Sequence, residues 1–136
     1  MIKKIDHIAI AVDNLDDAIA LYKKILGVDA AHREYVEEFK TDTATFKLGD
    51  SAIELVEGKT EDSAIRKFVD SKGPGIHHIA VVVEDIEAEI EKLKSEGVRL
   101  IDEAPRRGKE NSRVAFIHPK STDRVLYELV EPDSPE

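Results

Sequence analysis

The hydrophobic and polar positions of the chain pass through the same series of elements twice. In residues 3–12 and 75–83, bulky aliphatic side chains alternate with small or polar ones, as in a half-buried strand. Each strand leads through an acidic turn into an amphipathic helix, predicted over 14–26 and 85–95, and a glycine follows each helix. Three further strands follow in each half, predicted over 28–38, 42–48, 51–57, 98–104, 113–118 and 124–130. The order is β-α-β-β-β in both halves, which predicts an α+β fold.

The breaks in this pattern divide the chain into two modules within one domain of 136 residues. Module one covers 3–57 and module two covers 75–131. The linker 58–74 carries a short helix and ends in a glycine- and proline-rich break. A repeat of about 70 residues is too long for a solenoid, whose repeats span roughly 20–50 residues. We expect two half-sheets around a shared concave surface.

Both copies carry a histidine and a glutamate at matching places. His7 and His78 lie on the first strands, 71 residues apart, and Glu54 and Glu128 lie on the last strands, 74 residues apart. The alternation sets His7 beside Ala9 and Ala11, on the face of small residues and away from the helix. The same logic places the other three side chains on the inner faces of their strands. All four are therefore expected to point into one cavity.

Two imidazoles and two carboxylates suit a six-coordinate divalent metal ion with two positions left for water or substrate. The ligand types suit Co²⁺, Mn²⁺, Ni²⁺ or Fe²⁺, whereas Zn²⁺ in a catalytic site more often has three protein ligands and one open position. A single histidine on a strand is most often structural. A glutamate in an apolar strand is harder to explain, because an unpaired buried carboxylate costs free energy. Two of each, repeated in register, favour a metal site.

Composition excludes several classes of function. There is no cysteine, which rules out disulfides, thiolate metal ligands and thiol nucleophiles. The net charge of −9 argues against nucleic acid as a partner. No apolar run approaches the roughly 18 residues of a membrane span, and no apolar leader is visible, so we expect a cytoplasmic protein and no membrane partner.

The remaining histidines and the densest positive charge have alternative interpretations. Alternation points His77 away from the cavity, and His32 lies in a charged stretch that favours exposure to solvent. His118, at a strand end, is either part of the loop structure or a substrate contact. The run Arg106-Arg107-Gly108-Lys109 is either a solvated loop or a contact to a substrate phosphate or carboxylate.

At these residues the chain resembles the vicinal oxygen chelate superfamily, which includes glyoxalase I. Within it, residues 4–131 are most similar to the methylmalonyl-CoA epimerases. The resemblance rests on the two His-containing strands, on the linker from Glu61 to Phe68, and on the strand from Arg113 with its His118-Pro119-Lys120-Ser121 loop. Glyoxalase I typically carries an Asp-Pro-Asp-Gly type of turn at that loop.

The resemblance implies a paired, open-barrel fold and a metal site made of His7, Glu54, His78 and Glu128. It also implies epimerisation of (R)- and (S)-methylmalonyl-CoA, with the α-proton removed and returned through a metal-stabilised enolate. Glu128 would be the first catalytic base and Glu54 a candidate for the second. Substrate contacts are expected from four residues: Arg107, His118, Lys120 and Ser121. A homodimer and an acyl-CoA substrate are the implied partners.

The chain departs from the family pattern at three places. Some members carry a second carboxylate base where this chain has Thr43. The usual glycine-rich segment is Lys109–Ser112 here, and the usual Gly-Gly is Asp123-Arg124. Two alternative functions stay open, a glyoxalase I-like lactoylglutathione lyase acting on a hemithioacetal and a metal-free binding protein of the same fold.

Overall fold

A computed structural model describes residues 1–133 and divides the chain into two compact units. The first unit is His7–His77, and the second unit combines Met1–Asp6 with the residues from His78 onward. Both boundaries fall inside a strand, so β1 (Ile2–Ala11) and β5 (Gly75–Val83) each contribute residues to both units.

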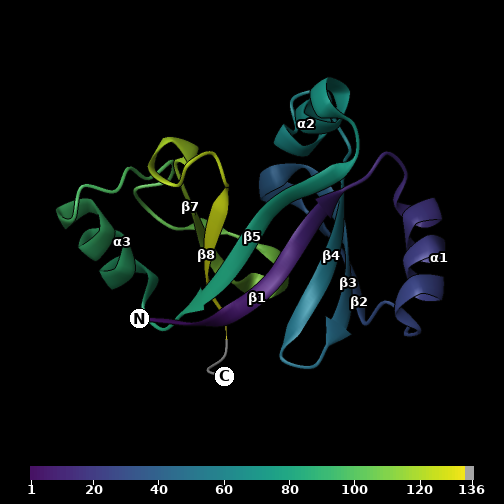
Figure 1. Cartoon of the computed structure of the whole chain (residues 1–136), viewed down its shortest axis with the longest axis horizontal. Coiled ribbons are helices and arrows are strands. Elements are labelled where there is room, and N and C mark those ends of the chain that lie inside the picture. The colour runs from purple at the N-terminus through teal and green to yellow at the C-terminus, as the bar shows by residue number, and fades with distance from the viewer. Residues whose placement is uncertain (134–136) are drawn as a thin grey trace. The chain divides into compact units, whose positions relative to one another are not determined.

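The first unit contains a four-stranded sheet in the order β2-β3-β4-β1 (Figure 1). β1 and β4 run parallel, whereas β2, β3 and β4 pair antiparallel. The elements that follow β1 are α1 (Leu15–Leu26), β2 (His32–Val36), the 3₁₀ turn η1 (Glu37–Phe39), β3 (Thr41–Leu48), β4 (Ser51–Gly58) and α2 (Ala64–Lys72).

The core of the first unit lies between α1 and one face of this sheet. Leu15 of α1 packs there with Phe46 of β3 and Leu55 of β4, and all three side chains are almost fully buried. The helix begins where the Asn14 side chain accepts a hydrogen bond from the Asp17 N–H, and it ends at Gly27, whose φ of 74° is the left-handed conformation that glycine adopts without strain. The helix predicted over 14–26 and the glycine that follows it are confirmed.

The second helix of this unit covers the other face of the sheet at one end. Ile65 of α2 packs with Ala11 of β1 and Val56 of β4, and Phe68 and Val69 lie against them. Gly58 allows this close approach, because a Cβ at that position would lie 2.5 Å from the Arg66 backbone nitrogen. His77 contacts the Phe68 ring edge-on, with the ring centroids 5.0 Å apart.

The second unit contains a sheet in the order β5-β8-β7-β6 (Figure 1). β5 and β8 run parallel, and the other pairs are antiparallel. The elements that follow β5 are α3 (Ile86–Ser95), β6 (Arg106–Arg107), the 3₁₀ turn η2 (Lys109–Asn111), β7 (Arg113–Ile117), the 3₁₀ turn η3 (Pro119–Ser121) and β8 (Tyr127–Glu131). Ile86 and Ile90 of α3 pack on Leu129 of β8.

The prediction of a strand over 98–104 was wrong. Only Leu100 forms a bridge, to Ile117, in this part of the chain. The Asp102 carboxylate accepts a hydrogen bond of 2.9 Å from the Phe116 N–H of β7. A side chain therefore satisfies a backbone donor that a neighbouring strand would otherwise have paired.

Two other predicted strands are shorter than expected. The segment 28–38 pairs only over β2, because the chain then enters η1 and Lys40 adopts a left-handed φ of 50°. The last strand begins at Tyr127 rather than at Arg124, since Asp123 and Arg124 have φ values of 53° and 77° that do not fit an extended strand. Among residues 1–133, no helix is both long and apolar enough to cross a lipid bilayer.

Candidate functional site

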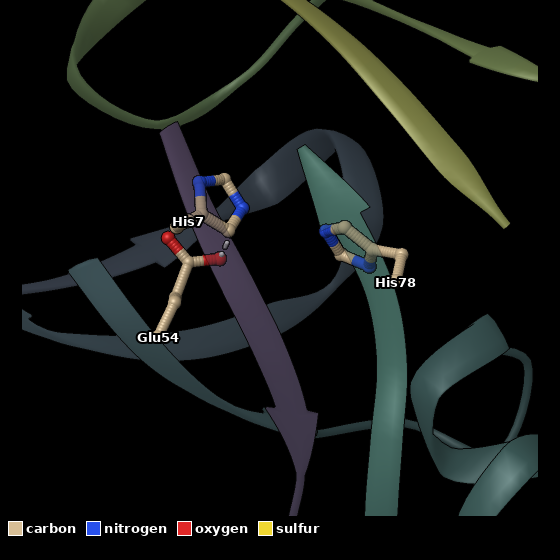
Figure 2. Close-up of side chains that lie close together, drawn as sticks. All are labelled: His7, Glu54 and His78. Carbon is tan, nitrogen blue, oxygen red and sulfur yellow. Dashed lines mark ion pairs between the residues drawn. The ribbon is translucent and has the colours of Figure 1, made fainter. Parts of the chain in front are cut away.

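The first unit contains a buried pair made of His7 and Glu54. Their nearest atoms, Nε2 of His7 and Oε1 of Glu54, are 3.5 Å apart, and the two residues are 3% and 5% exposed. Figure 2 shows the two side chains pointing toward one another from β1 and β4. In the parallel register Glu54 lies opposite Ala9, whose small side chain leaves room for the carboxylate beside the imidazole.

The second unit contains the matching pair, His78 and Glu128. Here His78 Nε2 and Glu128 Oε1 are 3.2 Å apart, and the residues are 6% and 7% exposed. The Phe116 ring meets the imidazole edge-on, with centroids 5.3 Å apart and planes at 89°. Phe116 is also the cross-strand neighbour of Glu128, so one apolar ring borders both members of the pair.

The two pairs have the same register within their units. Glu54 lies opposite Ala9, two residues after His7, and Glu128 lies opposite Ala80, two residues after His78. The predicted duplication therefore extends to the placement of the side chains. The structure brings the four residues together as two His–carboxylate pairs, one in each unit.

The chemistry of these side chains fits a divalent metal ion. His7, Glu54 and His78 are buried, and each offers one atom that can ligate a metal. Imidazole nitrogens and carboxylate oxygens bind first-row divalent ions at about 2.0–2.2 Å. Two ligands at adjacent corners of an octahedron with such bonds lie about 3 Å apart. The measured separations of 3.5 Å and 3.2 Å are close to that spacing.

On the Glu54 face of the first unit, the neighbouring strands carry polar residues. Thr45 lies opposite Glu54, and His32 lies opposite Thr45 on β2. His32 therefore lies on the same face of the sheet as Glu54, and its side chain is 39% exposed. Its Nε2 lies 3.0 Å from Oε1 of Glu34, which is itself opposite Thr43. Glu34 was not among the residues predicted from the sequence, although its alternation with the exposed Arg33 and Tyr35 was a usable signal.

On the Glu128 face of the second unit, the neighbouring edge carries a cation. Arg106 lies opposite Val114, which is opposite Val130, two residues from Glu128. Arg107, the expected substrate contact, pairs with Arg113 and so lies on the other face, where its guanidinium donates a hydrogen bond to Asn111. Arg106 rather than Arg107 therefore lies on the same face of the sheet as Glu128. From the sequence, Arg106 had been named only as part of a charged run.

The loop after β7 holds the three other expected substrate contacts. His118 caps η3, with its Nδ1 accepting a hydrogen bond of 3.1 Å from the Lys120 N–H, and Ser121 Oγ accepts one of 2.8 Å from the Arg99 N–H. Partial loss of solvent and the positive charges of Arg99 and Lys120 lower the pKa of His118. His118 and Ser121 therefore have structural partners in this loop, whereas the Lys120 side chain is exposed.

Comparisons with known proteins place the chain in a family. Residues 6–116 match the model of the Glyoxalase/Bleomycin resistance protein/Dioxygenase superfamily. The chain is 39% identical over 132 residues to the mitochondrial methylmalonyl-CoA epimerase of Dictyostelium discoideum, covering 96% of this chain and 79% of that protein.

Solved structures support the same family. A Streptomyces coelicolor methylmalonyl-CoA epimerase variant in complex with 2-nitronate-propionyl-CoA has a TM-score of 0.96 at 37% identity, covering 100% of this chain and 99% of that chain. The Mycobacterium tuberculosis methylmalonyl-CoA epimerase has a TM-score of 0.94 at 42% identity, covering 98% and 90%. A "Probable lactoylglutathione lyase" of Vibrio cholerae is less similar, at 27% identity over 129 residues, covering 94% and 90%. The expected fold class is confirmed, and the chain belongs to the methylmalonyl-CoA epimerase family within this superfamily.

Proposed function

We propose that this chain is an isomerase that interconverts (R)- and (S)-methylmalonyl-CoA. The supporting observation is the pair of buried His–Glu sites in matching register, found in a chain of the epimerase family. The expectation of an epimerase rather than a lyase is confirmed at the level of the family. The substrate of this chain is inferred from its relatives. One of them is an epimerase whose structure was solved in complex with methylmalonyl-CoA.

In the proposal, four residues bind the metal ion. His7 and Glu54 would supply two ligands, and His78 and Glu128 would supply the other two. Two neutral imidazoles with two carboxylates balance the charge of a divalent ion, and this donor set is hard enough for Co²⁺, our first choice, or for Mn²⁺, Ni²⁺, Fe²⁺ or Zn²⁺. When bound, the ion would act as a Lewis acid toward the thioester carbonyl of the substrate.

Glu128 is our choice for the base that removes the α-proton. The proton lies between a thioester carbonyl and a carboxylate, and its removal leaves an enolate. A carboxylate that is 7% exposed, beside the Phe116 ring, is shielded from water and holds its position on β8. The apolar side chains around it also keep competing proton donors away from the enolate. We assign Glu54 to metal ligation, and its role as a second base stays a prediction from the sequence.

Binding an anionic acyl-CoA to a chain of net charge −9 requires local positive charge. Arg106 is the cation of β6 on the face of Glu128, and Lys120 is the exposed cation of the loop after β7. We assign to these two the contacts with the substrate carboxylate or the CoA phosphates. Arg107, His118 and Ser121 stay predicted contacts. The homodimer and the cytoplasmic location stay predictions from the sequence.

Deuterium exchange at the α-carbon tests the proposal. Methylmalonyl-CoA is incubated in D₂O with metal-stripped protein and then with Co²⁺ restored, and incorporation is followed by mass spectrometry. We expect exchange that requires the metal and is lost in Glu128→Gln. A folded, metal-loaded protein that gives no exchange would exclude the epimerase function.

The alternative function is a lactoylglutathione lyase acting on a hemithioacetal, which the same four ligands would suit. The 27% identity to the Vibrio cholerae protein is its support. Assay of the metal-loaded protein with the hemithioacetal of methylglyoxal and glutathione distinguishes the two functions. We expect no turnover of this substrate.

A further inference from the structure

We propose that the Phe116 ring receives the alkyl group on the α-carbon of the substrate and limits its size, so that Phe116 is a specificity-determining residue. This inference rests on the proposed epimerase function. It uses only residues of the second unit, where Phe116 neighbours the proposed base Glu128. Phe116 takes no part in the proton transfer itself.

The α-carbon of the proposed substrate carries four different groups, and one of them is an alkyl group. The thioester carbonyl and the carboxylate bear oxygen atoms, which need cations or hydrogen-bond donors once they leave water. The hydrogen atom must point at the base, because proton transfer needs approach to hydrogen-bonding distance. The methyl group is stabilised only by burial against apolar atoms. An apolar surface beside Glu128 is therefore the expected location of the alkyl group.

Phe116 provides such a surface. It is the cross-strand neighbour of Glu128 on β7, and side chains at such positions have Cβ atoms about 4.5–5.5 Å apart. On the other side of Glu128, β5 offers Ala80, whose side chain is small and fully buried. Val114 and Val130, the next pair along the same face, are also buried. Phe116 is half-buried, so among these neighbours its ring has apolar surface left to contact a ligand.

Several contacts hold the ring in place. Its edge-on packing against the His78 imidazole sets the two centroids 5.3 Å apart. The Phe116 N–H donates a hydrogen bond of 2.9 Å to the Asp102 carboxylate, and the Phe116 carbonyl accepts one of 2.8 Å from the Ile101 N–H. A larger alkyl group would have to displace this ring, which costs free energy as overpacking does in a core. The ring is therefore a limit on size rather than an adaptable surface.

The Asp102 carboxylate also connects the ring to a cation. Its Oδ1 lies 3.5 Å from the Arg106 guanidinium, while its Oδ2 accepts the hydrogen bond from the Phe116 N–H. Arg106 lies on the face of Phe116, because it is opposite Val114, two residues earlier on β7. One carboxylate thus holds a cation suited to an oxygen-bearing group and an apolar ring suited to the alkyl group. Such a pair would orient the α-carbon toward Glu128.

The test compares substrates that differ only in the α-alkyl group: malonyl-CoA, methylmalonyl-CoA and ethylmalonyl-CoA. Deuterium incorporation at the α-carbon by the metal-loaded protein, corrected for uncatalysed exchange, gives kcat/KM for each. We expect the wild type to favour methylmalonyl-CoA over ethylmalonyl-CoA by about 10-fold or more, as one methylene group can be worth in an apolar pocket. Phe116→Ala should reduce this preference by about 10-fold or more, with Phe116→Leu between the two. Malonyl-CoA, which has no alkyl group, should be affected least.

Tyr127→Leu is the matched control for Phe116→Leu. Tyr127 is also a half-buried aromatic residue of the paired strands, but it lies on the opposite face and packs against the core that α3 forms with the sheet. Its replacement should leave the ratio of kcat/KM between methylmalonyl-CoA and ethylmalonyl-CoA unchanged. A folding defect would lower both values together, whereas loss of the size limit changes their ratio.

The outcomes separate this inference from the proposed function. An unchanged ratio in folded Phe116→Ala and Phe116→Leu overturns the role of Phe116 and leaves the epimerase function standing. Equal kcat/KM for the methyl and ethyl substrates in the wild type overturns the size limit in the same way. Absence of exchange with every one of the three thioesters in the wild type overturns the proposed function, and this inference with it.

Discussion

The two units hold their His–Glu pairs in the same way and differ at the outer strands. In both, an alanine faces the glutamate, and a second glutamate three residues later accepts a hydrogen bond from the first N–H of the unit's helix. Glu57 accepts from Leu15 N at 2.7 Å, and Glu131 accepts from Ile86 N at 3.0 Å. The central strands are therefore duplicated down to individual hydrogen bonds.

The outer strands of the two units carry different side chains. The first unit presents the hydroxyl of Thr45 and the His32–Glu34 dyad, on strands that pair over their full length. The second unit presents the Phe116 ring on β7 and Arg106 on β6, a strand of only two residues. Under the proposed function, a metal held by matching ligands would account for the similar centres. A substrate with different groups at its two ends would account for the different edges.

The largest expected effect is a difference in epimerisation rate between variants of Glu128 and variants of Glu54. Glu128→Gln should lower epimerisation by about 10²- to 10⁴-fold, because an amide cannot remove a proton. Glu54→Gln should lose much less, since an amide oxygen still ligates a divalent ion. Steady-state assays of the Co²⁺-loaded variants measure both. Equal losses would mean that the two pairs share the same role.

The next effect tests whether the two histidines are equivalent. With Co²⁺ at 100 times its dissociation constant, the wild type should gain about 2.7 kcal/mol in free energy of unfolding. His7→Ala and His78→Ala should both lose this gain while they unfold normally without metal. Thermal or urea unfolding with and without Co²⁺ gives the comparison. A metal-dependent gain that survives in one variant would show that this histidine is not a ligand.

The two glutamates that bind the helix N-termini should contribute equally to stability. Glu57→Ala and Glu131→Ala each remove an acceptor from a first-turn N–H, and we expect a loss of about 1–2 kcal/mol in free energy of unfolding for each. Urea denaturation measures this loss. Glu61→Ala, an exposed residue of the linker, is the control and should change little. A negligible loss at one site would show that the helices are held differently.

We expect backbone strain at Arg124, in a loop of the second unit, but not at Gly27, at the end of α1 in the first unit. Gly27 and Arg124 have φ values of 74° and 77°, so the same conformation is occupied by glycine in one place and by arginine in the other. Gly27→Ala should destabilise by about 1 kcal/mol, and Arg124→Gly should stabilise by about 0.5–1 kcal/mol. Unfolding curves measure both changes. Destabilisation by Arg124→Gly would show that the arginine side chain outweighs the strain.

The smallest expected effect concerns the pKa of His118 in the loop after β7. The pKa of His118 lies below its usual value, because of lost solvent and the charges of Arg99 and Lys120. The folded state therefore favours neutral His118, and this contribution to stability is present above about pH 6.5 and is lost as the pH falls through the folded pKa. Lys120→Gln should raise the pKa of His118, as measured by NMR titration. An unchanged or lower value would contradict the charge effect.

Much of the fold follows from local patterns in the chain. The repeat of strand, helix and three strands, the helix caps and the His–Glu positions depend on residue spacing alone. Alternation over two residues and periodicity over 3.6 residues are local properties, because they come from backbone geometry. The failed strand over 98–104 shows the limit. Its pattern was suitable, yet Asp102 took the N–H of Phe116 that a paired strand would have used.

The sequence by itself determined the two modules, the four metal-ligand candidates and the family to which they point. Only the tertiary structure decided which faces of the outer strands look inward. The pairing offset between β2 and β3 brought His32 and Glu34 to the face of Glu54, and that between β6 and β7 brought Arg106 rather than Arg107 to the face of Glu128. The physical reason is that a shift of one residue in strand register exchanges the two faces, and no local pattern records the register.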